Sequence, residues 1–383
     1  MKVLLHTLVI FIIQTSCAQD MQYAREIVNK LSSARFWGRG YTKDGMKEAT
    51  KFLSKEFKKA GIQPMKGDSY LQSFSYPVNT FPGKMEVELN GKKLKPGKDF
   101  IISPESQGLK AKNTLLSPKD STHYSALQNK LKVTLHKKLT WGVSQQQADY
   151  TWIQLDSKQV REKPQSISIN IENKFIPSFQ TANVCGMVKG KRKPDSIILI
   201  TAHYDHLGGM GKKTFFPGAN DNASGVSLLL NLASYYSKNP QPYTMAFICF
   251  SGEEAGLVGS KFFTEHPPFP LSKIRFLVNL DLTGTGDEGI TVVNAKVFKK
   301  DFDLLNSTNK SAKYLPKITE RGKSSNSDHH WFTEKNIPSF FIYTLGGIKA
   351  YHDIEDKALT LPLAAYPSLF KLLTDFNGKL MGN

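Results

Sequence analysis

Acidic and histidine side chains recur in four short segments of the second half of the chain. The segments read AHYDHLGG, PGANDNASG, SGEEAG and NLDLTG, and three of them adjoin the apolar runs IILIT, TMAFICF and RFLVNL. The candidate side chains are His203, Asp205, Asp221, Glu253, Glu254 and Asp281. Carboxylates that share one crevice repel one another unless protons or cations neutralise them. Together with the imidazoles, these carboxylates predict a pair of divalent metal ions.

The elements that must position these side chains follow a strand and helix alternation from residue 197 onward. Such alternation is typical of a parallel sheet covered on both faces. The expected strands are IILITA, TMAFICF, RFLVNL, ITVV and PSFFIY, and the expected helices span residues 223–237, 255–264, 298–308 and 361–379. Ligands in open α/β sheets bind beyond the carboxyl ends of the strands. We therefore predict an α/β fold in which a mixed, largely parallel central sheet is flanked by helices.

The first half of the chain has a different pattern. Residues 21–32 and 44–60 show helical periodicity, and Gly61 supplies a stop signal after the second helix. Short alternating segments then follow from about residue 70 to 185, including MEVEL, a hairpin turn at Asn90-Gly91, YTWIQL and SISINI. This change predicts a β-rich insert between the opening helices and the sheet.

The first eighteen residues indicate the compartment. Lys2 precedes an apolar stretch over residues 3–13, and small residues follow up to Ala18, which is typical of a secretory signal peptide over residues 1–18. Cleavage after Ala18 would give a periplasmic or secreted protein, whereas cleavage before Cys17 with a lipid on its thiol would give a membrane-anchored lipoprotein. Both outcomes stay open. No other stretch approaches the roughly 18–20 apolar residues of a membrane span, so we expect no transmembrane segment.

Composition excludes several classes of protein. The chain has 383 residues, of which 40% are hydrophobic and 22% charged, and these values exclude a coiled coil, a collagen-like chain or a disordered tail. Its 51 Lys and Arg residues exceed its 33 Asp and Glu residues, but they are scattered along the sequence. Because no zinc finger, RNA-binding aromatic signature or helix-turn-helix pattern accompanies them, we expect a solvated basic surface and no nucleic-acid partner.

Six motifs in fixed order carry a family resemblance. The motifs AHYDHLG, GANDNASG, SGEEAGLVGS, NLDLTG, SDHHWF and YHDIEDK resemble those of the co-catalytic dizinc aminopeptidases, zinc exopeptidases related to glutamate carboxypeptidase, the transferrin receptor ectodomain and, more distantly, glutaminyl cyclase. The resemblance implies a zinc exopeptidase fold of the phosphorylase/hydrolase-like type. It predicts N-terminal helices of the peptidase domain over residues 19–79 and a dizinc peptidase core over 183–383. Some relatives carry a protease-associated domain in the position of residues 80–182, so this insert is either a reduced form of that domain or another module.

The resemblance also implies a ligand set. Asp221 would bridge two zinc ions, His203 and Asp281 would complete one of them, and Glu254 and His352 would complete the other. Imidazole nitrogen and carboxylate oxygen are suitable zinc ligands, and catalytic zinc sites leave one position open for water.

Three further residues match catalytic roles in the family. Asp205 would accept the second ring N–H of His203 and fix its tautomer. Glu253 would act as general base on a hydroxide shared by the two ions and return the proton to the leaving amine. Tyr351 matches a tyrosine that hydrogen-bonds the oxyanion in some relatives, although simple packing beside His352 is an equal alternative.

The remaining histidines have weaker assignments. His206 is not a ligand in the family pattern, and Asp328, His329 and His330 are expected to line the substrate pocket.

The resulting prediction is an exported metallo-exopeptidase, and specifically an aminopeptidase that removes N-terminal residues from peptide substrates. A carboxypeptidase acting on acidic peptides would need a basic pocket, for which Lys212, Lys213, Arg321 and Lys323 are candidates. A single-metal glutaminyl cyclase or a non-catalytic binding ectodomain would be expected to lack some of the ligands or the base, and all are present here. Oligomeric state is left open.

Overall fold

The computed structural model describes residues 19–382 of the chain. The predicted signal peptide over residues 1–18 and the lipid-attachment alternative at Cys17 lie outside these described residues. Within residues 19–382, no helix has the length and apolar character that crossing a membrane requires.

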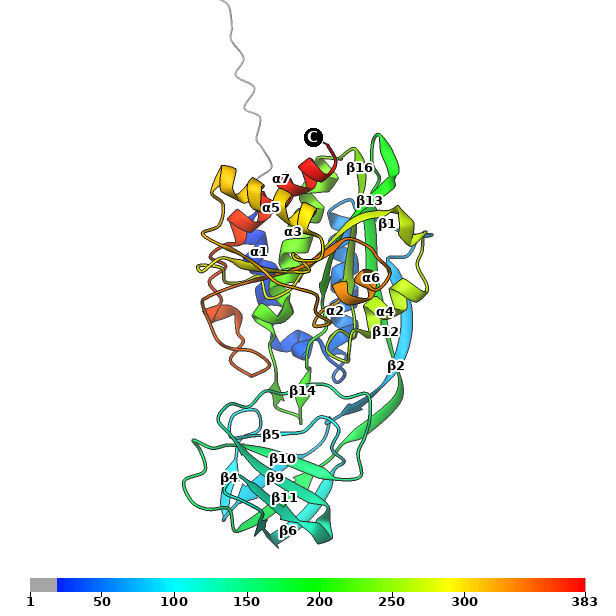
Figure 1. Ribbon diagram of the computed structural model, residues 1–383. Coiled ribbons are helices and arrows are strands. Elements are labelled where there is room, and N and C mark those ends of the chain that lie inside the picture. Colours follow the sequence, from blue (N-terminus) through cyan, green and yellow to red (C-terminus); the bar gives the residue numbers. More distant parts are fainter. Residues whose placement is uncertain (1–18, 383) are drawn as a thin grey trace, which may run out of the picture.

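A nine-stranded mixed sheet forms the centre of the larger lobe (Figure 1). The strand order is β1-β12-β16-β13-β17-β20-β18-β19, and β2 also pairs with β12. Strands β16, β13, β17 and β20 run parallel to one another, whereas β12 and β18 pair antiparallel on either side of them. The strands span Gln63–Pro64 (β1), Leu71–Thr80 (β2), Lys174–Val188 (β12), Lys193–His203 (β13), Tyr243–Phe250 (β16), Ile274–Leu280 (β17), Ile290–Val293 (β18), Ile318–Glu320 (β19) and Ser339–Thr344 (β20). The predicted mixed, largely parallel α/β fold is thus confirmed, with its parallel part in the middle.

Helices cover both faces of this sheet. They span Met21–Leu31 (α1), Gly45–Lys59 (α2), Gly225–Lys238 (α3), Val258–Glu265 (α4), Lys299–Ala312 (α5), His329–Thr333 (α6) and Tyr366–Leu380 (α7). In β13, Ile198 and Ile200 pack into the cluster that holds α1, α2, α3, α5 and α7, while Ile197 and Leu199 pack into the cluster that holds α4 and α6. This is the alternation that a strand buried on both faces requires.

Two predicted helices begin later than expected. The helix predicted over 255–264 begins at Val258, because residues from Glu253 to Leu257 form turns and Leu257 has a φ of 61°. The helix predicted over 361–379 begins at Tyr366, and Pro367 occupies its first turn, where a missing N–H costs nothing.

The insert forms a smaller, all-β lobe (Figure 1). A five-stranded sheet has the order β5-β10-β9-β8-β7 and a four-stranded sheet has the order β4-β3-β11-β6. Their strands span Met85–Leu89 (β3), Lys92–Leu94 (β4), Phe100–Ile102 (β5), Leu109–Leu115 (β6), Ser117–Pro118 (β7), His123–Ala126 (β8), Leu131–His136 (β9), Thr151–Asp156 (β10) and Ser166–Ile171 (β11). A separate hairpin pairs β14 (Gly209–Met210) with β15 (Thr214–Phe215).

Long strands connect the two lobes. Strands β2 and β12 run from the large sheet into the insert and pair along most of their length (Figure 1). The apolar core of the insert also includes Leu207, Met210 and Phe216 from the peptidase lobe. The domain boundaries predicted at residues 80 and 182 fall at the end of β2 and inside β12 respectively, and they stay a prediction.

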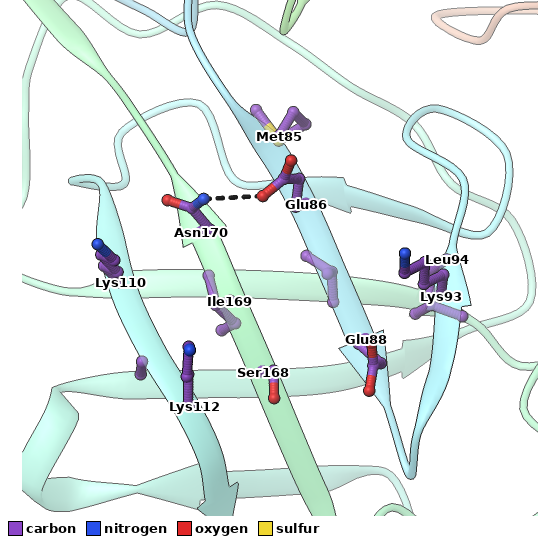
Figure 2. Close-up of a pocket in the computed structure, with 12 residues that line it drawn as sticks. Met85, Glu86, Glu88, Lys93, Leu94, Lys110, Lys112, Ser168, Ile169 and Asn170 are labelled. Carbon is purple, nitrogen blue, oxygen red and sulfur yellow. Dashed lines mark hydrogen bonds between the residues drawn. The ribbon is translucent and has the colours of Figure 1, made fainter.

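The outer face of the four-stranded sheet is hollowed, with a volume of about 400 Å³ (Figure 2). Glu86 and Glu88 on β3 and Lys110 and Lys112 on β6 lie on either side of β11, and Asn170 Nδ2 donates to Glu86 Oε2 at 2.7 Å. None of the predicted metal ligands lines this hollow.

Candidate metal centre

The predicted ligands meet at the carboxyl edge of the parallel strands. His203 is the last residue of β13, and Asp281 directly follows β17. Glu253 and Glu254 lie in the turn after β16, Asp221 lies in the irregular segment Ala219–Ser224 that precedes α3, and His352 lies in the loop after β20. Parallel strands direct their carboxyl ends to one edge, which is why residues from five separate segments converge.

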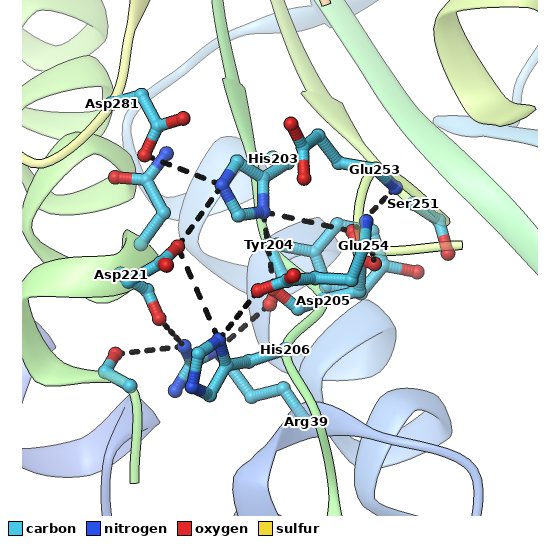
Figure 3. A network of polar contacts seen from close by, with 12 residues as sticks. Arg39, His203, Tyr204, Asp205, His206, Asp221, Ser251, Glu253, Glu254 and Asp281 are labelled. Atoms are coloured by element: carbon cyan, nitrogen blue, oxygen red, sulfur yellow. Dashed lines mark hydrogen bonds and ion pairs between the residues drawn. The ribbon is translucent and has the colours of Figure 1, made fainter. Parts of the chain in front are cut away.

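Asp221 lies between two groups of donor atoms. Its Oδ1 is 3.3 Å from His203 Nε2, which is also 3.3 Å from Asp281 Oδ1. Its Oδ2 is 3.1 Å from His352 Nε2, which is also 3.1 Å from Glu254 Oε2. One carboxylate therefore offers one oxygen to each of two histidine-containing groups. Figure 3 shows the first of them, with Asp221 and Asp281 beside His203.

These separations fit zinc. Nitrogen and oxygen donors at about 2.0–2.2 Å from a tetrahedral ion are about 3.3 Å apart. Among residues 19–382, Nε2 of His203 and Oδ1 of Asp281 are buried and have no hydrogen-bond partner. His203, Asp221 and Glu254 form one potential metal-holding group, and His203, Glu253 and Asp281 form a second. Both groups contain His203, and the two oxygens of Asp221, each 3.1–3.3 Å from a different histidine, fit a pair of zinc ions that share this carboxylate.

The charges of the site also favour cations. Burial raises the pKa of Asp328 to about 7 and that of Asp205 to about 6, although His203 opposes both shifts. Burial, together with repulsion from Glu254, raises the pKa of Glu253 well above its usual range. Burial alone would lower the pKa of His203, but attraction to Asp281 and Glu253 raises it well above the usual value. The raised pKa values of the carboxyl groups and of His203 both reflect uncompensated negative charge in a buried site.

The structure corrects the predicted contact between Asp205 and His203. His203 Nδ1 lies 3.2 Å from the main-chain carbonyl oxygen of Asp205, whereas the carboxylate Oδ1 is 3.8 Å away. The carboxylate instead accepts the main-chain N–H groups of Glu253 and Glu254, each at 3.2 Å. Asp205 therefore orients His203 through its backbone, and its side chain orders the turn that carries the two glutamates.

His206 is part of the centre although the sequence analysis gave it no role. Its side chain is fully buried, and Nδ1 lies 2.7 Å from Glu254 Oε1. Because Glu254 offers its other oxygen, Oε2, to His352, His206 is placed to orient that carboxylate. The only signal in the sequence is a histidine three residues after His203.

Asp356 supports the segment that carries Asp221. Its two carboxylate oxygens accept the main-chain N–H groups of Asn220 at 2.8 Å and Asp221 at 3.0 Å. The peptide bond between Asp221 and Asn222 is cis, and Asn222 Nδ2 donates to the carbonyl of Leu280 at 2.9 Å. The sequence motif YHDIEDK contains Asp356, but only the folded chain brings it to Asp221.

Tyr351 and the SDHHWF motif lie beside these groups. The Tyr351 ring stacks on that of His352 with centroids 4.0 Å apart, and 43% of the tyrosine remains exposed. Ser327 Oγ donates to Asp281 Oδ2 at 3.2 Å. Asp328 and His329 are buried, so they are less available to a substrate than the predicted pocket-lining role requires.

Arg39 is a buried cation beneath the metal centre (Figure 3). Burial lowers its pKa to about 10, which still leaves it protonated at neutral pH. The guanidinium donates five hydrogen bonds of 2.7–3.0 Å to main-chain carbonyls, those of Leu31, Tyr204, Pro217, Gly218 and Asp221. It therefore ties the opening helices to the segments on which Asp205 and Asp221 lie.

Replacing Arg39 with leucine is expected to lower the free energy of unfolding by at least about 3 kcal/mol, because each buried carbonyl left without a donor costs roughly 1–3 kcal/mol. Denaturant unfolding measures this loss. Arg35→Leu is the matched control, since that side chain is 75% exposed and forms a surface ion pair with Glu48, and it should change stability by less than about 0.5 kcal/mol. Similar losses in the two variants would contradict the assigned role of Arg39.

A comparison with known families decides the relationship. Residues 183–376 match the model of peptidase family M28. The chain belongs to peptidase family M28. The matched region contains all five predicted ligands of this M28 member, so the geometry described above lies in the family's own part of the chain.

Individual relatives agree with this assignment. The M28 member is 28% identical over 236 residues to aminopeptidase YwaD of Bacillus subtilis (strain 168), covering 58% of this chain and 49% of that protein. It is 34% identical over 112 residues to a probable zinc metalloprotease of Pyricularia oryzae, covering 28% of this chain and 22% of that protein. The chain thus spans about half or less of the curated relatives that it matches.

Solved structures share its fold. BSAP, a zinc aminopeptidase from Bacillus subtilis, superposes with a TM-score of 0.70 at 18% identity, covering 95% of both chains. A peptidase M28 precursor from Shewanella amazonensis superposes with a TM-score of 0.71 at 15% identity, covering 94% of this chain and 93% of that one. At such identities these similarities establish the fold.

Proposed function

We propose that this M28 member is a zinc-dependent aminopeptidase. The proposal rests above all on Asp221, whose two oxygens face His203 and His352 separately. A carboxylate shared between two donor groups suits two ions better than one. His203 and Asp281 would hold the first ion with Asp221, and Glu254 and His352 would hold the second.

When bound, the two zinc ions would lower the pKa of a water molecule and stabilise negative charge on the scissile carbonyl oxygen. Glu253 is not one of these five proposed ligands, but its carboxylate lies within 4.8 Å of ligand atoms of His203 and Asp281. Its carboxylate would take a proton from water and return it to the departing amine. The bond between the Glu253 N–H and Asp205 Oδ1, at 3.2 Å, would hold the turn in place meanwhile. Tyr351, next to His352, would offer its hydroxyl group as a hydrogen-bond donor to the oxyanion.

Charge favours the amino end of a peptide over its carboxyl end. Several carboxyl groups lie in the site, among them the half-buried Glu253 and the buried Asp328 and Asp281, and those that are ionised attract an α-ammonium group. The carboxypeptidase alternative relies on exposed basic residues, and Lys323 among them is paired with Glu334 at 2.6 Å. The names of the curated and structural relatives point in the same direction.

The direction of attack can be tested with paired substrates. We expect hydrolysis of aminoacyl reporter peptides that begin with apolar or basic residues, and a loss of roughly 30- to 150-fold in kcat/KM when the α-amine is acetylated, since a desolvated charged contact is worth about 2–3 kcal/mol. Steady-state rates on free and acetylated forms of the same peptide measure the difference.

A matched pair blocked at the other end, with free acid and amide carboxyl termini, serves as the control and should differ little. Equal cleavage of acetylated peptides with release of carboxyl-terminal residues would instead support the carboxypeptidase alternative.

Export is a separate part of the proposal. The lysine, apolar stretch and small residues within residues 1–18 support a secretory signal. The enzyme would then act outside the cytoplasm, either free or held by a lipid on Cys17.

A further inference from the structure

An irregular segment of the insert crosses to the metal centre. Residues 137–150 connect β9 to β10, and we call them the crossing segment. This segment contacts both the loop that carries Glu254 and the loop that carries His352. Three of its residues, Lys138, Trp141 and Gln145, make these contacts.

The main chain of Trp141 makes two hydrogen-bond contacts with His352. The Trp141 N–H donates to the carbonyl oxygen of His352 at 3.0 Å. The carbonyl oxygen of Trp141 lies 2.9 Å from His352 Nδ1. A carbonyl can only accept, so Nδ1 must carry the proton in this contact. The lone pair of Nε2 is then directed at Asp221 and Glu254, 3.1 Å away in each case, which is the tautomer that a metal ligand needs.

The Trp141 side chain explains why this main chain stays in place. The residue is only 5% exposed, and its ring stacks on Phe216 with centroids 4.6 Å apart. Its Nε1 donates to the carbonyl oxygen of Ile102 in β5 at 2.8 Å. The indole is therefore anchored to the insert on one side and to the peptidase lobe on the other.

Two more contacts hold the neighbouring loops. Lys138 Nζ donates to the carbonyl oxygen of Lys349 at 3.0 Å and lies 3.8 Å from Asp353, which follows His352. Gln145 Nε2 donates to the carbonyl oxygen of Ala255, the residue after Glu254, at 2.7 Å. The crossing segment thus hydrogen-bonds to the main chain close to both His352 and Glu254. Within residues 19–382, neither His203 nor Asp281 forms a hydrogen bond or ion pair with this segment.

We infer that the insert is a positioning element of the metal centre, in which Trp141 fixes the tautomer and orientation of His352. The inference rests on the proposed role of His352 as a zinc ligand. It assigns a task to residues 137–150 that a detachable binding module would not have: the ion held by Glu254 and His352 depends on the insert, and the ion held by His203 and Asp281 does not.

The test measures zinc affinity at each of the two sites. Metal-free full-length protein is titrated with zinc against a competing chelator, and circular dichroism checks the fold of each variant. Trp141→Leu removes the ring stack and the Nε1 donor, and it should weaken one zinc site by roughly 10- to 100-fold, the usual effect of losing a partner that orients a ligand. The other site should stay within about threefold of wild type. Trp141→Phe keeps a ring against Phe216 and should restore most of the lost affinity.

Trp152 offers a matched control within the same insert. It is a partly buried tryptophan of β10 whose Nε1 donates to Thr134 Oγ1 at 2.8 Å, away from the crossing segment. Trp152→Leu should leave both zinc affinities unchanged. Should Trp141→Leu fail to fold, Gln145→Leu replaces it in the test. This variant should also weaken zinc binding at one site only, by a smaller factor.

The outcomes separate this inference from the proposed function. Equal weakening of both sites by Trp141→Leu, or no weakening in a folded variant, would overturn the positioning role. A wild-type protein that binds two zinc ions but cleaves no aminoacyl peptide would instead contradict the proposed activity, while the effect of Trp141 on zinc affinity would still decide the inference.

Discussion

Glu253→Gln is expected to abolish nearly all peptide hydrolysis while both zinc ions and the fold are kept. Glutamine has the shape of glutamate but cannot accept a proton, and general bases contribute roughly 100- to 10,000-fold to the rate. Glu253 does not belong to the five proposed ligands, and its main-chain contact to Asp205 does not involve the altered group. Measuring kcat on a free aminoacyl peptide, together with zinc content by elemental analysis, tests both parts of this expectation.

Glu265→Gln is a suitable control for the Glu253 variant. Glu265 lies at the end of α4, in the same stretch of chain after β16, and its exposed carboxylate pairs with Lys261 at 3.2 Å. Its loss should leave turnover unchanged. If Glu253→Gln retained two zinc ions and stayed within tenfold of wild-type turnover, Glu253 would not be the base.

The convergence of the ligands could be predicted because it depends on local patterns. Apolar runs such as IILITA and TMAFICF are recognisable as buried strands, and parallel strands present their carboxyl ends to one edge. His203 and Asp281 therefore meet even though they lie 78 positions apart in the sequence. The family resemblance then supplied His352, whose loop carries no strand-end signal of its own.

The supporting contacts could not be predicted in the same way. Arg39 reaches Asp221 across 182 residues, and Trp141 reaches His352 across 211. The first contact depends on how distant segments of the peptidase lobe pack, and the second on how the insert packs against that lobe. Neither hydrophobic periodicity nor turn residues encode such packing. The side chain of Asp205 was misassigned for a related reason, since its position two residues after His203 does not reveal that the turn after β16 supplies competing N–H donors.

The insert illustrates the same limit on a larger scale. Its strands MEVEL, YTWIQL and SISINI could be recognised from their alternation, but nothing in them indicates that the connection between β9 and β10 turns toward the metal centre. The core of the insert includes Leu207 and Phe216, which flank the β14–β15 hairpin of the other lobe. A boundary drawn from sequence pattern alone cannot show that two lobes share apolar side chains.

Asp221→Asn is expected to remove both zinc ions from the protein. Each oxygen of Asp221 faces a different histidine, at 3.3 Å from His203 and 3.1 Å from His352. The amide keeps one neutral oxygen and replaces the other with a nitrogen that cannot coordinate zinc. Both ions therefore lose the negatively charged ligand that they share. The loss of affinity should exceed the roughly 10- to 100-fold that follows from removing an outer partner. Gel filtration in metal-free buffer followed by elemental analysis measures zinc per chain, which should be close to two in wild type and close to zero in the variant.

The unshared ligands make this expectation specific to a bridging carboxylate. Asp281→Asn should cost only the ion near His203, and Glu254→Gln should cost only the ion near His352, so each of these variants should keep close to one zinc per chain. If Asp221 merely completed one site, its variant would behave like one of these two and would also retain one ion. Only a shared ligand makes the zinc lost on Asp221→Asn as large as the zinc lost on Asp281→Asn and Glu254→Gln combined. Retention of one ion by Asp221→Asn would therefore replace the shared-ligand arrangement with two independent sites, and it would leave the role of Glu253 and the fold unaffected.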